Sequence, residues 1–557
     1  MSVVLDYADI QGNILLPYGK QGFPTGRNIL LHVDDAAGGR NFVTELLPLI
    51  TTALLWSDST KQASGKNAAE RAERPKVAVN IAFTFAGLLN LGVPIRTLQG
   101  LPDAFIDGMT FRAPVLGDDF GFADGEDFRA RWDMVWRRNP FGGGHVPGKD
   151  SVDILITLNV ARDGGERLKE VTDKIESLAA GNHVRVLEGH DPDGRQRYQE
   201  LSALQDKDGN YTPNEHFGFH DGIGDPVFEG QYLNEAGELD AIGNGAVDGH
   251  GKWRPISTGE FLLGYPDEAQ ETSGIMMPLS FARNGTFMAY RKLKQNVKKW
   301  NDFIDRKAKE FGVVFEIPKH DDAKQTLMAK MAGRWTDGVP VSAASTADEW
   351  RAFNRTHPEG SPERDKALVN FRYFDDPQGE RCPMGSHLRR VNTRDALDPQ
   401  AVFYEQLKKA QKPTDPPPPL DGSVLNNRRR LLRRGLPFGD NPPDLKDDSG
   451  ERGVVMYFMC ADLFRQFEFV QQQWINYGLD ARSGNDTCPI VGNHVEQATP
   501  GGPALAKFVI PAPEGSGHPP FIVDGIPQFV DMRGGGYFFV PSMTALRMIG
   551  MGTIDPT

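Results

Sequence analysis

An aspartate between glycines is the first feature of this chain that could do chemistry. Asp221 lies within the segment Glu215-His216-Phe217-Gly218-Phe219-His220-Asp221-Gly222-Ile223-Gly224-Asp225-Pro226. Because glycine has no Cβ, the backbone at Gly218, Gly222 and Gly224 can turn sharply and lie close to a ligand. A carboxylate on such a turn can face a cavity and serve as an acid–base group. Taken alone, the pattern also describes an ordinary surface turn.

A histidine followed by arginines is the second such feature. The segment is Cys382-Pro383-Met384-Gly385-Ser386-His387-Leu388-Arg389-Arg390-Val391-Asn392-Thr393-Arg394. An imidazole can bind a metal, and arginines bind carboxylates. Haem uses both kinds of contact, because its iron takes the imidazole and its propionates take the arginines. His387 is therefore a candidate haem ligand.

A basic run with apolar residues inside it is the third feature. It reads Leu431-Leu432-Arg433-Arg434-Gly435-Leu436-Pro437-Phe438-Gly439 and follows three further arginines at 428–430. A basic run by itself is typical of a solvated surface. The interleaved leucines and phenylalanine indicate that part of this run is buried, and a buried arginine needs an anionic partner.

Composition limits the class of protein and the cellular compartment in which such a site can occur. The 557 residues predict two domains, and the net charge of -13 argues against nucleic acid or an anionic membrane as the main partner. The three cysteines have no metal-finger spacing and indicate reduced thiols. The first residues show neither a basic nor an apolar leader region, and no stretch approaches the roughly 20 apolar residues of a membrane helix. These features predict a cytoplasmic protein.

Hydrophobic patterns predict the same order of elements in both halves of the chain. In the first half we expect strands at 28–33, 77–85, 153–160 and 184–187, and helices at 86–91 and 167–180. In the second half we expect strands at 260–265, 285–290, 453–460 and 536–541, and helices at 293–304 and 464–476. Loops are expected at 53–74, 411–422, 440–448 and 500–520. Two similar halves favour a duplicated, ferredoxin-like α+β unit with an antiparallel sheet.

The three motifs, in this order, resemble those of the dye-decolorizing peroxidases. The shared patterns are G-x-x-D-G, C-P-x-G-S-H-L-R-x-x-N-x-R and L-L-R-R-G-L-P-F-G. The opening D-I-Q-G-N-I-L at 9–15 and the segment 465–474 also resemble that family. The resemblance covers nearly the whole chain, whose length and missing leader are similar to the larger, signal-peptide-lacking subgroup.

The resemblance implies a fold, a cofactor and a division of the chain. The fold would be α+β, with two ferredoxin-like domains of the dimeric α+β barrel superfamily type and antiparallel sheets. Residues 1–250 would form the N-terminal domain, which carries the G-x-x-D-G motif. Residues 251–557 would form the C-terminal domain, which would bind haem b. A homo-oligomeric assembly stays open.

The resemblance also assigns roles to residues. His387 is similar to the proximal iron ligand, Asp221 to the distal acid–base aspartate, and Arg433 to the distal arginine, with its neighbour Arg434 as the alternative. Asp486 is expected to accept a hydrogen bond from His387. The resemblance also implies propionate contacts from Arg389 and Arg394. It implies distal-pocket contacts from Val454 and Met456.

The implied activity is that of a haem peroxidase. Such an enzyme would reduce hydrogen peroxide and oxidise dyes, phenols and similar electron donors, with Asp221 moving the proton and Arg433 stabilising negative charge. A free carboxylate has a pKa near 4, so we expect an acidic pH optimum. Two alternatives stay open: a haem-handling protein that releases iron with little turnover, and a haem-free α+β protein.

Overall fold

The computed structural model describes residues 3–63, 65–120, 127–138, 148–248, 252–272, 278–397, 424–440, 442, 445–494 and 506–554. Its centre is a nine-stranded sheet with the strand order β4-β1-β3-β2-β13-β8-β10-β9, and β5 pairs with β1. The strands of this sheet are β1 Thr25–Val33, β2 Val77–Phe83, β3 Ile154–Val160, β4 Val184–Leu187, β5 Gln199–Ser202, β8 Thr286–Gln295, β9 Leu432–Phe438, β10 Gly453–Cys460 and β13 Val530–Val540.

The sheet consists of two halves with one topology. In each half the four principal strands, numbered as they follow in the chain, lie side by side in the order fourth, first, third, second. A helix follows the first and the third strand of each half, as shown by α2 Ala36–Leu46, α8 Gly165–Gly181, α10 Val297–Val314 and the helical pair η5 Leu463–Glu468 and η6 Val470–Ile475. This β-α-β-β-α-β arrangement with antiparallel pairing confirms the predicted ferredoxin-like α+β fold.

The two halves meet where β2 lies beside β13. Only Phe83 and Phe539 pair there, whereas β13 and β8 pair along most of their length. The fully buried side chain of Gln11 completes the junction. Its amide nitrogen donates to the carbonyls of Ile81 and Pro541, each at 2.9 Å, and its oxygen accepts the Ile81 amide at 2.9 Å. Gln11 belongs to the D-I-Q-G-N-I-L opening, so this motif has a structural function.

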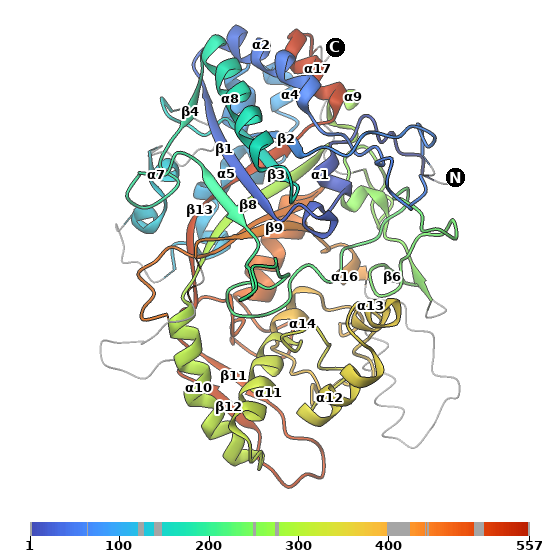
Figure 1. Cartoon of the computed structure of the whole chain (residues 1–557), viewed down its shortest axis with the longest axis vertical. Helices are drawn as coiled ribbons and strands as arrows, with labels where there is room; N and C mark the ends of the chain where they lie inside the picture. Colours follow the sequence, from blue (N-terminus) through green and yellow to red (C-terminus); the bar gives the residue numbers. More distant parts are fainter. Residues whose placement is uncertain are drawn as a thin grey trace.

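Helices cover the sheet and extend beyond it. Figure 1 shows α2, α8 and α17 at the upper end of the molecule and α10, α11, α12 and α14 at the lower end. The helices not yet given are α1 Gly12–Leu15, α3 Phe85–Asn90, α4 Ile95–Leu98, α5 Asp103–Phe111, α6 Ala113–Leu116, α7 Met134–Arg137, α9 Leu279–Ala282, α11 His320–Ala332, α12 Ala347–Thr356, α13 Pro362–Val369, α14 His387–Val391, α16 Val424–Asn427 and α17 Met543–Met551. Short 3-10 turns are η1 Tyr18–Gln21, η2 Leu47–Leu49, η3 Phe128–Arg131 and η4 Thr258–Glu260.

Separate apolar cores support the two ends. One core fills the space between the sheet and α2, α8 and α17. Another fills the lower end, where Trp300 of α10 packs against Phe217 at 4.9 Å and Phe529 at 5.0 Å between ring centroids. Phe217 precedes Asp221 by four residues, so this aromatic cluster anchors the aspartate-bearing loop. Two small sheets complete the fold, formed by β6 Ala246–Val247 with β7 Trp253–Arg254 and by β11 Lys507–Ile510 with β12 Phe521–Asp524.

Most predicted elements are present, and four predictions were wrong. Residues 260–265 are not a strand, because η4 ends at Glu260 and a turn follows. The strand predicted at 285–290 continues to Gln295, so the helix starts at Val297 rather than Leu293. The predicted loop at 500–520 contains β11, and the basic run, for which no element was predicted, is strand β9. Charged residues and prolines in or near these two segments argued against strands in the sequence. An edge strand nevertheless tolerates both residue types.

Some predictions lie outside the described residues. They are the loop 411–422, part of the loop 440–448 and the start of 500–520. Within the described ranges, no helix combines the length and apolar character that crossing a membrane requires.

Replacing Gln11 tests the junction between the two halves. Gln11→Leu should lower the free energy of unfolding by about 2–4 kcal/mol, because it leaves buried backbone groups of Ile81 and Pro541 without partners. Chemical denaturation measures this loss. Gln99→Leu, on an exposed helix end, is the control and should change stability little. Equal effects of the two changes would contradict the clamping role of Gln11.

Candidate functional site

A tight loop holds Asp221. Its amide donates to the Pro213 carbonyl at 3.0 Å, and its carboxylate accepts the Gly222 amide at 2.7 Å. Gly218 and Gly222 have φ angles of 94° and 76°, which are unfavourable for other residues. The glycines predicted to shape this turn therefore do so at these two positions.

The half-buried Glu215 organises the start of this loop. Its carboxylate accepts the amides of Phe217 and Phe219, each at 2.9 Å, and the side-chain amide of Gln295 on β8. Burial raises the pKa of Glu215 to about 7. The sequence analysis did not single out this second carboxylate, although it stands in the same segment.

Strand alternation separates Arg433 from Arg434. On the edge strand β9, Arg433 pairs with Phe458 and Arg434 with Tyr457 of β10. Consecutive side chains of a strand point to opposite faces. Arg433 forms a hydrogen-bonded ion pair with Asp221. Arg434 instead binds Asp225 at 3.0 Å and donates to backbone carbonyls of the N-terminal segment.

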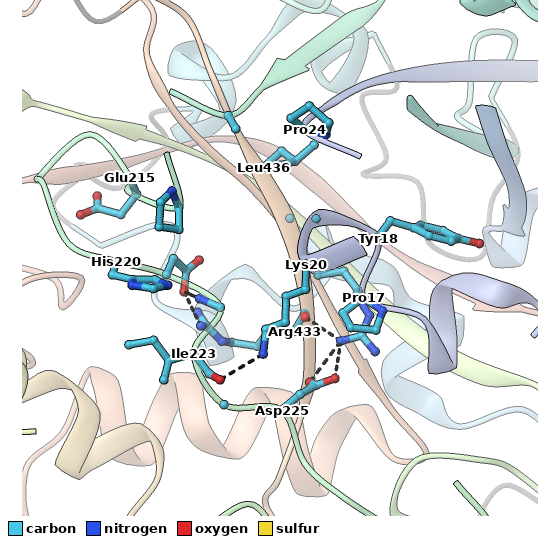
Figure 2. Close-up of a pocket in the computed structure, with 18 of the residues that line it drawn as sticks. Pro17, Tyr18, Lys20, Pro24, Glu215, His220, Ile223, Asp225, Arg433 and Leu436 are labelled. Carbon is cyan, nitrogen blue, oxygen red and sulfur yellow. Dashed lines mark hydrogen bonds and ion pairs between the residues drawn. The ribbon is translucent and has the colours of Figure 1, made fainter. Parts of the chain in front are cut away.

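Asp221 and Arg433 form the wall between two cavities. A cavity of about 1120 Å³ and one of about 850 Å³ are both lined by Asp221, Arg433, Val454 and Met456. The two charged side chains are 40 % and 41 % accessible, and this surface faces the cavities. Figure 2 shows the larger cavity, where Lys20 and Arg433 point toward the loop that carries Ile223 and Asp225. Asp221 is thus not on an ordinary surface turn.

Two opposing effects set the charge of this pair. Burial would raise the pKa of Asp221, but the charge and hydrogen bond of Arg433 outweigh it and hold the pKa below its ordinary value. Asp221 in turn raises the pKa of Arg433. The carboxylate is consequently charged in mildly acidic solution and available to accept a proton.

His387 lines the 850 Å³ cavity together with Asp221 and Arg433. It is the first residue of α14, and the hydroxyl of the preceding Ser386 donates to the Lys330 carbonyl at 2.6 Å. Three motifs that lie far apart in the chain therefore meet at one cavity. The described ranges contain no group of three or more His, Cys, Asp or Glu side chains that could hold a metal ion. They therefore offer no candidate site for a metal bound by side chains alone.

The predicted contact between Asp486 and His387 is wrong. The Asp486 carboxylate lies 2.8 Å from Lys507 Nζ instead. His387 Nδ1 lies 3.2 Å from the sulfur of Cys488, two residues further along. The sequence analysis looked for a carboxylate because this group is the common partner of a metal-bound imidazole.

The predicted propionate contact of Arg389 also disagrees with the structure. Arg389 is buried in an ion pair with Asp376 at 2.9 Å and lies over the Tyr373 ring at 4.5 Å. It is not among the residues that line the cavity. Residues two positions apart on a helix point in different directions. Arg389 therefore does not share the side of α14 that carries the His387 imidazole. Arg389 therefore stabilises the histidine-bearing segment.

Three other arginines face the 850 Å³ cavity: the half-buried Arg334 and the buried Arg394 and Arg430. Burial lowers the pKa of Arg334 and Arg394 to about 10 and that of Arg430 to about 9. In the described part of the chain their hydrogen bonds go to backbone carbonyls, and none of the three forms an ion pair with a carboxylate. Only Arg394 was predicted, and no local pattern marks the other two as cavity residues.

These observations fit haem. The cavity volume lies in the range of about 300–1,000 Å³ that is typical of ligand pockets. His387 offers an imidazole, and the three cavity-lining arginines need anionic partners of the kind that two propionates provide. An apolar lining that includes Leu388, Phe458 and Ile490 suits the faces of a macrocycle.

Comparisons with known proteins show what the whole chain is similar to. Residues 9–181 match a family model described as the DyP dimeric alpha+beta barrel domain. The chain is similar to "Peroxidase 2" of Mycetinis scorodonius, with 27 % identity over 98 % of this chain and 88 % of that protein. It is 26 % identical to a dye-decolorizing peroxidase of Mycena epipterygia over 98 % and 87 % of the two chains. A solved dye-decolorizing peroxidase in complex with 2,6-dimethoxyphenol shares the fold, with a TM-score of 0.67 and 23 % identity over 98 % and 100 % of the chains.

Removing the positive charge from the ion pair tests its electrostatics. Arg433→Met should raise the pKa of Asp221 above the ordinary carboxyl value, because burial then acts without a compensating charge. Infrared titration measures this pKa through the protonated carboxyl band that is absent from Asp221→Asn.

The matched control is Arg434→Met, which removes the neighbouring arginine but leaves the pair intact. It should leave the Asp221 titration close to that of the unaltered protein. An unchanged titration in Arg433→Met would show that this arginine does not control Asp221.

Proposed function

The chain belongs to the dye-decolorizing peroxidase family, and from this premise we propose that it is a haem peroxidase that reduces hydrogen peroxide and oxidises dyes, phenols and similar electron donors. One observation carries the proposal: the Asp221–Arg433 ion pair and the His387 imidazole line the same cavity. A proton acceptor, a fixed cation and a metal ligand are the side chains that peroxide reduction at a haem needs.

The cofactor we propose is haem b. His387 would bind the iron, and Arg334, Arg394 and Arg430 would bind the propionates, which would compensate their buried charges. The bound haem supplies the redox chemistry by which peroxide is reduced and a donor oxidised. Val454 and Met456 would limit the space beside Asp221 and Arg433.

Asp221 is the proposed proton carrier. Its pKa lies below the ordinary value, so it accepts a proton from hydrogen peroxide in mildly acidic solution and returns it to the departing oxygen. Arg433 is held by this carboxylate and directs its charge into the cavity, where it would stabilise negative charge on peroxide oxygen. Both roles remain available on the acidic side of neutrality, where we expect the pH optimum.

The larger cavity is the proposed route of approach. It shares the Asp221–Arg433 wall with the smaller cavity, so a small molecule that enters it reaches both side chains. A phenol or peroxide is small enough for this route, whereas a bulky dye would react from outside.

Two further assignments belong to this proposal. We retain a boundary near residue 250, since the strands that the first half contributes to the nine-stranded sheet end at Ser202 and those of the second half begin at Thr286. For the compartment we propose the cytoplasm, which the three unpaired cysteines support.

Haem uptake followed by turnover tests the function. The purified protein supplemented with haem should show a Soret band, and added peroxide should drive oxidation of an anthraquinone dye and of 2,6-dimethoxyphenol. His387→Ala should lose the Soret band because the iron loses its ligand. Haem binding without turnover would favour the haem-handling alternative, and no haem binding would exclude both.

The role of Arg433 is tested by kinetics. Arg433→Leu should retain haem but lower the rate constant for the reaction with peroxide by about 10²–10³, the effect typical of losing one charge-stabilising group. Stopped-flow absorbance of the Soret region measures this rate. Arg434→Leu is the control and should react close to normally, since Arg434 binds Asp225. Full reactivity in Arg433→Leu would refute the assignment.

A further inference from the structure

Cys488 occupies a fixed position beside the cavity. Its side chain is fully buried, its amide donates to the Ile475 carbonyl at 2.7 Å, and its carbonyl accepts the Gly492 amide at 3.0 Å. The Nε2 atom of His494 also lies 2.9 Å from this carbonyl. A Cβ on Gly492 would approach the Cys488 amide to 2.7 Å, so the turn needs glycine here. The backbone thus leaves the sulfur little freedom.

The sulfur faces a hydrogen-bond donor. His387 Nδ1 lies 3.2 Å away. The buried guanidinium of Arg390 contributes positive charge nearby, and its own hydrogen bonds go to backbone carbonyls, among them Asp486 at 2.6 Å. A sulfur in this position can accept a hydrogen bond from the Nδ1–H of His387.

No carboxylate competes for this position in the described residues. Asp486, the nearest acidic residue along the chain, is bound to Lys507. With Nδ1 occupied by Cys488, the Nε2 atom is the nitrogen of His387 left for a metal. Which nitrogen of a histidine binds a metal is set by the hydrogen bond of the other.

We propose that Cys488 is the positioning residue of His387, whose Nδ1–H it accepts in place of a carboxylate. This inference rests on the proposed function, because it assigns His387 to the haem iron. A hydrogen bond from Nδ1 fixes the ring and makes the imidazole more electron-donating. The sulfur therefore stabilises the ferric over the ferrous state of bound haem.

Substitution of Cys488 in the haem-bound protein tests this role. Cys488→Ala should make the midpoint potential of the haem iron more positive and lower the iron–imidazole stretching frequency of the ferrous form. Both changes follow because the imidazole loses its hydrogen-bond acceptor. Spectroelectrochemical titration and resonance Raman scattering measure them. Cys488→Asp, which restores an acceptor, should move both values back toward those of the unaltered protein.

The matched control is Cys460→Ala, which removes an equally buried sulfur that does not line either cavity. It should keep the potential and the stretching frequency of the unaltered protein. If Cys488→Ala proves unstable, Cys488→Val fills the space without accepting a hydrogen bond and should give the same shifts.

The outcomes distinguish a failure of the role of Cys488 from a failure of the proposed function. An unaltered protein that binds haem and turns over, with Cys488→Ala or Cys488→Val matching Cys460→Ala in both measurements, overturns the role of Cys488 alone. An unaltered protein without a Soret band overturns the proposed function and this inference with it.

Discussion

The ion pair between Asp221 and Arg433 is the interaction on which the site depends. It joins residues 212 positions apart and ties a glycine-rich loop to the edge strand β9. Each partner keeps the other ionised, because Arg433 holds the pKa of Asp221 below its ordinary value and Asp221 raises that of Arg433. The pair therefore fixes the loop, keeps the carboxylate ionised and leaves both side chains facing cavity space.

The duplicated sheet explains how these partners reach each other. Each half has the same strand order, and β9 at the end of that order lies against β5 of the first half. The Tyr457 hydroxyl on the neighbouring β10 donates to Asn28 of β1 at 2.7 Å, so the two halves also meet on this side. The loop at 215–226 crosses there from the first half and meets Arg433 of the second. A cavity bounded by both halves results, and neither half could build it alone.

Sequence patterns predicted the fold and much of the site because both use short-range signals. Apolar runs indicated β3 and β10, and glycines indicated the turn at Asp221. In the structure two of these glycines have φ angles above 70°. Local patterns failed where the environment is set by distant residues. Strand β9 is basic because one face meets Asp221 and the other Asp225, which no pattern within β9 indicates. Arg389 and Arg394 look equivalent in sequence, yet Asp376 pairs with only the first.

The sequence alone determined which residue types could do chemistry, the order of the motifs and the repeated β-α-β pattern, since these depend on residue identity and local periodicity. The packing of the folded chain determined which of these candidate residues lie at the site. The alternation of β9 chose Arg433 over Arg434, and the turn at 488–492 put a sulfur rather than the Asp486 carboxylate beside His387. Arg334 and Arg430 became cavity residues only through folding. Such choices depend on which side chains meet across long stretches of chain, and that information is tertiary.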